Sequence, residues 1–275
     1  MKRIILLFNF VNSLLLGDVL LEQVLRADGF MGTATSEIRS KTLVHGDRLR
    51  VDTRIKICGL TSGKIEQKQV TIIQLDKEKV LNLDPKTKTY RETDFSELRE
   101  KAGHLKSRIQ PRSSPAIEII KKDETKRMVG HNCKHIIVKM KTRISDPETG
   151  EPIKGVLKND MWISDLFKEA EVLVNFNKRF ADATGIPALQ QDMMREFGID
   201  TYEYAQFEET IRAIKGFPIY TLVSIESEEL NQEGRGYVFF SAVNEIKKIS
   251  PVQTGAGEFE IPKGYKKIED NGKIY

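Results

Sequence analysis

The sequence is poor in cysteine, in net charge and in long apolar runs. Only two of its 275 residues are cysteine, which excludes a small scaffold built on many disulfides. No apolar run reaches the roughly 20 residues of a membrane-spanning helix, which excludes a polytopic membrane protein. Lys and Arg number 44 against 40 Asp and Glu, and the two signs are interleaved. The sequence therefore lacks the basic footprint of a nucleic-acid-binding protein.

Common catalytic motifs are also missing. There is no glycine-rich phosphate loop after a strand, no Gly-x-Ser-x-Gly elbow, no His-Glu-x-x-His helix and no paired Cys-x-x-Cys. Asp160 beside Met161 and Trp162 is a lone candidate carboxylate, and one carboxylate does not make an acid–base site. We therefore predict a protein that is not an enzyme, with no catalytic residue, no metal and no cofactor.

The N-terminus has the pattern of an export signal. Met1-Lys2-Arg3 precedes an apolar stretch from Ile4 to Leu16, which is too short to span a bilayer. We predict a signal peptide over residues 1–17 and a periplasmic or otherwise exported bacterial protein. Cleavage after Gly17 would lack the small-x-small pattern, so an amphipathic first helix or a misassigned start is the alternative.

The two cysteines leave two interpretations open. In an oxidising compartment Cys58 and Cys133 could form a disulfide that closes a loop of 75 residues. The alternative is a pair of free thiols.

Most of the chain from Asp18 onward reads as antiparallel strands. In the clearest strand, from Arg48 to Ile57, charged and apolar residues alternate strictly, which is typical of a strand with one buried face. Further strands are predicted at 35–44, 70–75, 79–84, 89–92, 133–144, 156–164, 217–228 and 234–249, with a hairpin over 117–129 that turns at Asp123-Glu124.

Helical periodicity interrupts this series twice. One helix is predicted from about 95 to 106, and a helical insertion of about 165–215 contains helices at 165–183, 187–197 and 203–214. With no linker in between, 18–275 is predicted to be a single domain. Its class is α+β: a curved antiparallel β-meander, an unclosed half-barrel, whose concave face is capped by the helical insertion.

Three strands are apolar on both faces and therefore need a covering layer on each side. The first interpretation is that the helices fill the interior completely. The second is an apolar cavity for a hydrophobic ligand. The candidate lining residues are Trp162, Tyr220, Leu222, Tyr237 and Phe239.

One cluster in the sequence contains residue types that bind metal ions. His131, Cys133 and His135 are two residues apart, so a strand would bring them to one face, and imidazole and thiolate suit zinc or copper. Gly130 just before them favours an ordinary start of a strand, and we assign no metal.

The order of these parts resembles the LolA/LolB-like superfamily of periplasmic lipoprotein carriers, and in particular exported families of unknown function that are thought to share its fold. The motifs that carry the resemblance are Gly-Asp-Arg-Leu-Arg-Val at 46–51, Asp-Pro-Lys-Thr-Lys-Thr-Tyr at 84–90, Val-Gly-His-Asn-Cys at 129–133, Met-Trp-Ile-Ser at 161–164, Gly-Phe-Pro-Ile at 216–219 and Phe-Glu-Ile-Pro-Lys-Gly-Tyr at 259–265.

The resemblance implies an unclosed barrel capped by helices, with a cavity that holds acyl chains. This sequence departs from the family in its larger helical insertion and in the charged strand face at 48–56, and no residues match a carrier-to-receptor transfer motif. We therefore expect an exported protein that binds a lipid or another hydrophobic ligand. The alternative is a non-enzymatic envelope protein with a packed interior, whose charged face from Arg48 to Lys56 contacts a protein partner.

Overall fold

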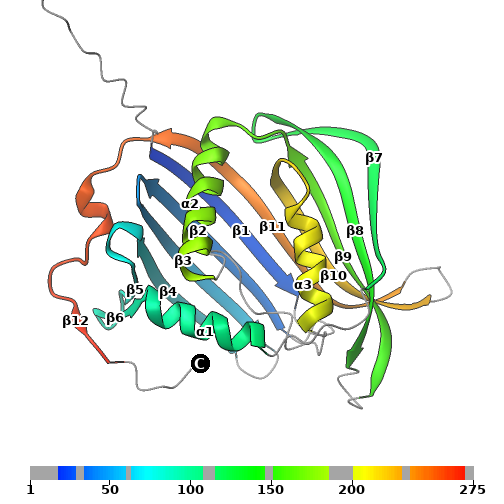
Figure 1. Ribbon diagram of the computed structural model, residues 1–275, viewed down its shortest axis with the longest axis horizontal. Coiled ribbons are helices and arrows are strands. Elements are labelled where there is room, and N and C mark those ends of the chain that lie inside the picture. Colours follow the sequence, from blue (N-terminus) through cyan, green and yellow to red (C-terminus); the bar gives the residue numbers. More distant parts are fainter. Residues whose placement is uncertain are drawn as a thin grey trace, which may run out of the picture.

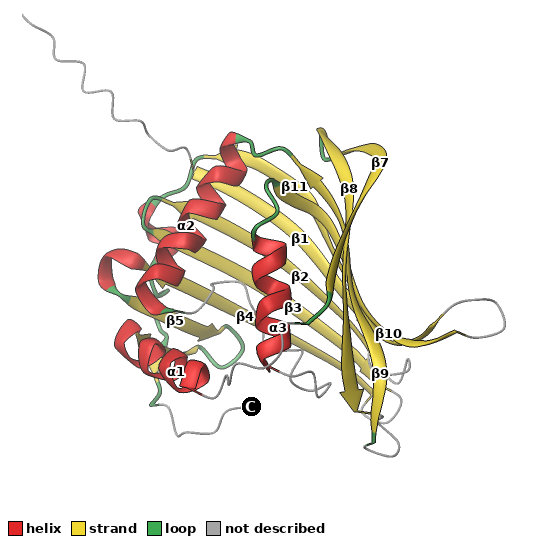
Figure 2. Ribbon diagram, turned by 45° about the vertical axis from the view of Figure 1, so that its right-hand side comes forward, coloured by secondary structure: helices red, strands yellow, loops and turns green. Residues whose placement is uncertain are grey.

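A computed structural model of the chain describes residues 18–28, 34–59, 63–107, 115–145, 151–185, 201–230 and 236–269. In this part of the chain all strands belong to one sheet of twelve, in the order β12-β6-β5-β4-β3-β2-β1-β11-β10-β9-β8-β7. The sheet curves without closing, and three helices lie on its inner face (Figures 1 and 2). This confirms the predicted unclosed antiparallel meander with helices on one face.

The elements have the following bounds. The strands are β1 (Asp18–Asp28), β2 (Ala34–His45), β3 (Arg48–Gly59), β4 (Gly63–Gln74), β5 (Lys79–Asp84), β6 (Thr89–Asp94), β7 (Ile117–Met128), β8 (His131–Ser145), β9 (Pro152–Ser164), β10 (Phe217–Leu230), β11 (Gly236–Val252) and β12 (Lys266–Lys267). The helices are α1 (Phe95–Ser107), α2 (Lys168–Thr184) and α3 (Thr201–Arg212), with 3₁₀ turns η2 (Leu75–Lys77) and η4 (Ala256–Phe259).

The alternation in β3 separates the two faces of the sheet. Leu49 pairs with Val44 of β2 and Ile73 of β4, and all three are buried on the inner face. Arg50 is on the opposite face, because successive residues of a strand point to opposite sides. The half-buried strand predicted from Arg48 to Ile57 is therefore confirmed.

The predicted hairpin at Asp123-Glu124 is wrong. Residues 117–128 form the single strand β7, which pairs with β8 along its whole length. The register shifts between Lys122 and Thr125, so Asp123 and Glu124 bulge out of the strand instead of turning it. Such a bulge bends a strand and re-aims its side chains, and from sequence alone it has the polar composition of a turn.

Helix α2 fills the inner face of one half of the sheet. Its residues Val172, Leu173, Phe176 and Phe180 pack with inner-face residues of β1, β2 and β3, and the ring of Phe180 meets that of Phe95 of α1 edge to face at 5.3 Å. The helical periodicity that predicted this helix coincides in part with its core-facing side: Leu173 and Phe180 are buried, whereas Val174 is exposed.

The outer face of the same half has a cover of its own. Phe259 in η4 is fully buried against the outer-face residues Leu20, Leu43, Ile72 and Leu81. The side-chain amide of Gln74 donates a hydrogen bond to the Phe259 carbonyl at 3.0 Å, and Arg50 donates one to the Glu258 carbonyl at 2.8 Å. This half of the sheet is therefore packed on both faces.

The disulfide between Cys58 and Cys133 is absent. Cys58 is exposed on β3, Cys133 is buried on β8, and both are free. Five strands separate β3 from β8, which places them about 30 Å apart along the sheet at about 4.8 Å per strand. A disulfide needs Cα atoms within about 7 Å, so the fold rules out this pairing.

Some predictions concern segments outside the described residues. These are the signal peptide at 1–17, the helix at 187–197 and the turn at 146–150. Within the described ranges, no helix has the length and apolarity needed to cross a membrane.

Candidate functional site

The five residues predicted to line a cavity are divided between the two faces of the sheet. Met161 of β9 packs on the inner face together with Phe207 of α3. Trp162 follows it and therefore lies on the outer face, directly opposite Tyr220 of β10. Leu222 also lies on this outer face, because it is two residues along the same strand. These three residues are neighbours, but none of them lines a hollow next to α3, and Trp162 packs against the cluster that contains the core residues of α2.

The remaining two predicted residues lie near the start of β11. Phe239 is buried and packs in the inner cluster that contains Phe207. Tyr237 is 64% exposed and lines none of the hollows described below. The five residues therefore do not form one cavity.

The outer-face residues belong to a polar and aromatic cluster around His135 of β8. Its ring stacks on Trp162 with centroids 4.6 Å apart and planes at 6°. Nε2 of His135 is 2.7 Å from Oδ1 of Asp160, and Nδ1 is 3.2 Å from Oε2 of Glu124. The bulge in β7 brings Glu124 to this position, so both ring nitrogens have a carboxylate partner.

Tyr220 borders this cluster. Partial burial raises the pKa of its hydroxyl, and the nearby carboxylates of Asp160 and Glu245 raise this pKa further. The hydroxyl therefore stays protonated at neutral pH and is available as a hydrogen-bond donor.

The predicted cluster of His131, Cys133 and His135 does not converge on a common centre. His131 stacks on Phe167 with ring centroids 3.8 Å apart, His135 contacts the carboxylates named above, and Cys133 is buried, which raises the pKa of its thiol. No three His, Cys, Asp or Glu residues of the described part of the chain are arranged to hold a metal ion.

A hollow lies on the inner face, between α3 and the strands β7 and β8. Its volume is about 710 Å³. Ile119 of β7, Ile136 of β8 and Ile214 just after α3 give it apolar walls. The charged residues Lys121, Lys215 and Glu209 line it as well, and neither lysine makes an ion pair or side-chain hydrogen bond with a described residue. The hollow thus combines apolar walls with two lysines and one carboxylate, a formal excess of one positive charge.

Helix α3 is held loosely over this part of the sheet. Among its described side chains only Phe207 is buried, while Tyr204 and Ile211 are partly buried. A second hollow of about 170 Å³ lies under α3 and is lined by Leu157, Phe207 and Asn159. Oδ1 of Asn159 is buried there without a hydrogen-bond partner among the described residues, and an unpartnered buried acceptor is costly.

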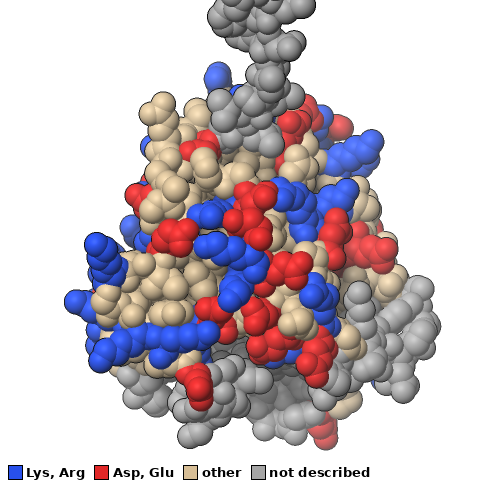
Figure 3. Space-filling model, turned by 60° about the vertical axis from the view of Figure 1, so that its left-hand side comes forward, with Lys and Arg blue, Asp and Glu red and all other residues tan. Residues whose placement is uncertain are grey.

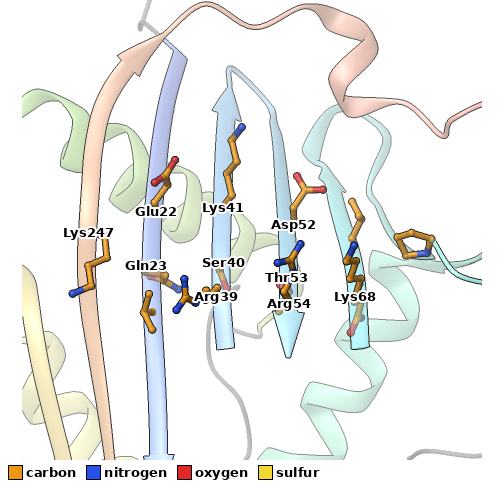
Figure 4. A pocket seen from close by; sticks show the side chains of 14 residues that line it. Glu22, Gln23, Arg39, Ser40, Lys41, Asp52, Thr53, Arg54, Lys68 and Lys247 are labelled. Carbon is orange, nitrogen blue, oxygen red and sulfur yellow. The ribbon is translucent and has the colours of Figure 1, made fainter. Parts of the chain in front are cut away.

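The outer face carries a third hollow, of about 430 Å³, where β11, β1, β2, β3 and β4 run side by side (Figure 4). Charged side chains surround it: Glu22, Arg39, Lys41, Asp52, Arg54, Lys68 and Lys247. Elsewhere the outer surface is a mosaic, and in the view of Figure 3 basic and acidic groups are interleaved.

Sequence reasoning missed the residues of the two hollows next to α3, although the sequence contains signals for them. Phe207, Ile211 and Ile214 recur at helical spacing within the predicted helix at 203–214. Ile119 is 46% exposed on a strand that is otherwise largely polar, and an apolar residue in that setting is a signal of an incomplete cover.

Comparisons with known proteins give distant structural neighbours. No protein-family model and no curated protein sequence matches the chain. One similar structure, from Vibrio parahaemolyticus, is described as an outer membrane lipoprotein-sorting protein domain; it is 9% identical, covers 89% of each chain and has a TM-score of 0.26. A β-barrel-like protein of unknown function from Brucella abortus is 10% identical, covers 86% of this chain and 98% of its own, and has a TM-score of 0.24.

Proposed function

We propose that the chain is an exported binding protein for an amphiphile with an acyl chain and an anionic head group. The observation that carries this proposal is the inner hollow between α3, β7 and β8. Its volume of about 710 Å³ lies within the range of roughly 300–1,000 Å³ that is usual for small-molecule sites. The apolar N-terminal segment supports export.

The walls of the hollow match the two parts of such a ligand. The isoleucines Ile119, Ile136 and Ile214 present a surface on which an acyl chain loses its contact with water. Lys121 and Lys215 supply positive charge within the same hollow, where a carboxylate or phosphate head group would pair with them. Glu209 also lines the hollow, so the formal excess is one positive charge, and a neutral hydrocarbon would leave this charge without a partner.

The weak anchoring of α3 supports entry of a long ligand. The helix is fastened by the buried ring of Phe207 and by a hydrogen bond from the Thr142 hydroxyl of β8 to Oε2 of Glu203 at 2.7 Å, while Tyr204 and Ile211 are only partly covered. A small shift of the helix would open the hollow with little loss of buried apolar surface, because elements with few buried contacts open at low cost.

The first test looks for a native ligand. The protein is expressed with export, purified without detergent and extracted with organic solvent, and the extract is examined by mass spectrometry. We expect a lipid or fatty acid in a near-stoichiometric amount. Binding of a fluorescent long-chain fatty acid to the extracted protein then gives a dissociation constant.

The second test places the ligand in the hollow. Ile119→Glu should weaken binding of the fluorescent fatty acid by about tenfold or more, because full burial of such a side chain contributes about 1.5–3 kcal/mol. Ile65→Glu is the matched control, because Ile65 is 47% exposed on β4 and Ile119 is 46% exposed on β7. Equal binding by wild type and Ile119→Glu would contradict the proposal, as would wild-type protein that neither carries a lipid nor binds the fatty acid.

A further inference from the structure

Three cations form one row across adjacent strands of the outer face. Arg39 of β2 is directly opposite Arg54 of β3, which is directly opposite Lys68 of β4. All three side chains are exposed. Like charges that face each other directly across strands destabilise a sheet, so this row has a cost unless something compensates it. We call Arg39, Arg54 and Lys68 the cation row (Figure 4).

In the rows on either side, positive and negative side chains alternate across the strands. On one side Arg26, Glu37, Lys56 and Glu66 alternate in sign from β1 to β4. On the other side Glu22, Lys41 and Asp52 alternate from β1 to β3. Complementary cross-strand pairs are thus the pattern of this surface, and the cation row is a local exception to it.

The neighbouring carboxylates do not neutralise the row fully. Nε of Arg39 donates to Oε1 of Glu37 at 2.7 Å, but Nε of Arg54 is 3.7 Å from the nearest oxygen of Glu66. The side chain of Lys68 has no hydrogen bond or ion pair with any described residue. Its ammonium group, and the remaining guanidinium N–H groups, are available to an outside anion.

The other charges around the hollow add to this excess. Lys41 is also without an ion pair to a described residue. Asp52 is engaged by both Nε and Nη2 of Arg50 at 2.8 Å, so its charge is already matched from outside the hollow. Five cations and two carboxylates line the hollow, a formal excess of three positive charges, and of the five cations Lys247 is paired outside the hollow with Glu245 at 2.5 Å.

The excess positive charge surrounds a hollow that is large enough to hold an anion. The hollow has a volume of about 430 Å³, and Val24 and Val70, both buried, lie on its floor. At about 4.8 Å between strands, the cation row spans about 10 Å. A single tetrahedral oxyanion in the hollow can accept hydrogen bonds from neighbouring members of the row, and guanidinium groups pair with phosphate through two parallel bonds.

We propose that the cation row binds one phosphate group. The basic character is confined to this row and its hollow, since the rows on both sides alternate in sign. The surface therefore matches a single phosphate better than a long polyanion or a flat anionic membrane. The phosphate belongs either to a phosphorylated head group or to inorganic phosphate. This site is on the opposite face of the sheet from the inner hollow and does not depend on the ligand proposed for that hollow.

Titration calorimetry with inorganic phosphate at constant ionic strength tests the site, with chloride as the balancing anion. The variant carries Arg54→Gln and Lys68→Gln. The control carries Arg26→Gln and Lys56→Gln, which removes the same charge from the adjacent alternating row. We expect the first variant to lose about tenfold or more in affinity, as for the loss of one or two charge-assisted hydrogen bonds, and the control to bind like wild type. Equal losses in both variants would overturn the proposal, since they would show a general charge effect.

Two further readouts keep the test decisive. Without phosphate, the Arg54→Gln, Lys68→Gln variant should have a higher Tm than wild type, because the like-charge contacts are relieved; with phosphate, only wild type and the control should gain stability.

Flotation with vesicles of phosphatidic acid, compared with phosphatidylcholine, distinguishes the source of the phosphate group. Row-dependent binding to phosphatidic acid identifies a head group, and row-dependent binding to inorganic phosphate alone identifies the free ion. No row-dependent binding to either probe would refute the site.

Discussion

The two halves of the sheet are covered very differently on their inner face. Helix α2 buries six residues against one half: Ala170, Val172, Leu173, Phe176, Phe180 and Thr184. Helix α3 buries only Phe207 among its described side chains, and a hollow lies on either side of that anchor. The first half also has η4 on its outer face. One continuous sheet thus contains a closely packed half that stabilises the fold and a loosely covered half that leaves room for a ligand.

The sharpest test of this difference uses two phenylalanines of equal exposure. Phe176 of α2 and Phe207 of α3 are each 2% exposed. Phe176→Ala should lower the free energy of unfolding by about 4 kcal/mol, because a closely packed site cannot collapse around the cavity. Phe207→Ala should lower it by only about 2 kcal/mol, because α3 can detach locally. Urea unfolding gives both values, and equal losses would contradict the division into a packed and a loosely covered half.

The junction after α3 offers the next largest effect. Gly216 has φ +119°, and a Cβ added there would lie 2.4 Å from the carbonyl oxygen of Ser164 and 2.5 Å from Cγ2 of Ile163. Gly216→Ala should therefore cost about 3 kcal/mol. Gly46→Ala is the control: its φ is +55° and nothing lies within 4 Å of the added Cβ, so it should cost about 1 kcal/mol. Thermal unfolding of the two variants measures the difference, and equal costs would show that the close approach to β9 is unimportant.

A smaller, pH-dependent effect is expected at the start of β1 in the packed half. Burial opposes ionisation of Asp18, but hydrogen bonds from Thr254 and His45 outweigh it and hold the pKa of this carboxyl below its ordinary value. The ionised carboxylate therefore stabilises the fold above about pH 4, and this contribution is lost as the pH falls through the lowered pKa. Asp18→Asn should cost about 2 kcal/mol at pH 7 and progressively less below pH 4. A cost that stays constant from pH 7 to pH 3 in urea unfolding would contradict this assignment.

The smallest effect should have the opposite sign. Asn159 places an unpartnered carbonyl oxygen under α3, so Asn159→Leu should stabilise the ligand-free protein by about 1 kcal/mol. Comparison of Tm values with and without bound fatty acid measures this change. A loss of stability in the ligand-free variant would show that the amide has a partner in solution and that this part of the interior is better satisfied than we infer.

Much of the fold could be predicted because its signals are local. The alternation from Arg48 to Ile57 depends on side-chain burial at every second residue, and the amphipathic stripe of α2 depends on the helical repeat. The bulge at Asp123-Glu124 could not be distinguished from a turn, because both tolerate unpaired polar residues. The free state of Cys58 and Cys133 follows from strand order, which a sequence does not state.

The site was harder to predict for a related reason. Alternation showed that Tyr220 and Leu222 share a face of one strand, but it could not show that Trp162 of the neighbouring strand joins them, or which face the helices cover. Likewise, the cation row is invisible in the sequence, because Arg39, Arg54 and Lys68 become neighbours only through the pairing of β2, β3 and β4. Single strands predict which residues share a face, whereas sites depend on the register between strands.

The open sheet has a further consequence for solubility at high concentration. An unclosed sheet has two edge strands, and an unprotected edge can pair with the edge of another molecule and nucleate aggregation. At one edge, β12 covers part of β6. At the other, β7 carries charged side chains along most of its length and is interrupted by its bulge, two features that discourage edge-to-edge pairing. The irregularity in β7 thus protects the molecule from self-association through its longest open edge.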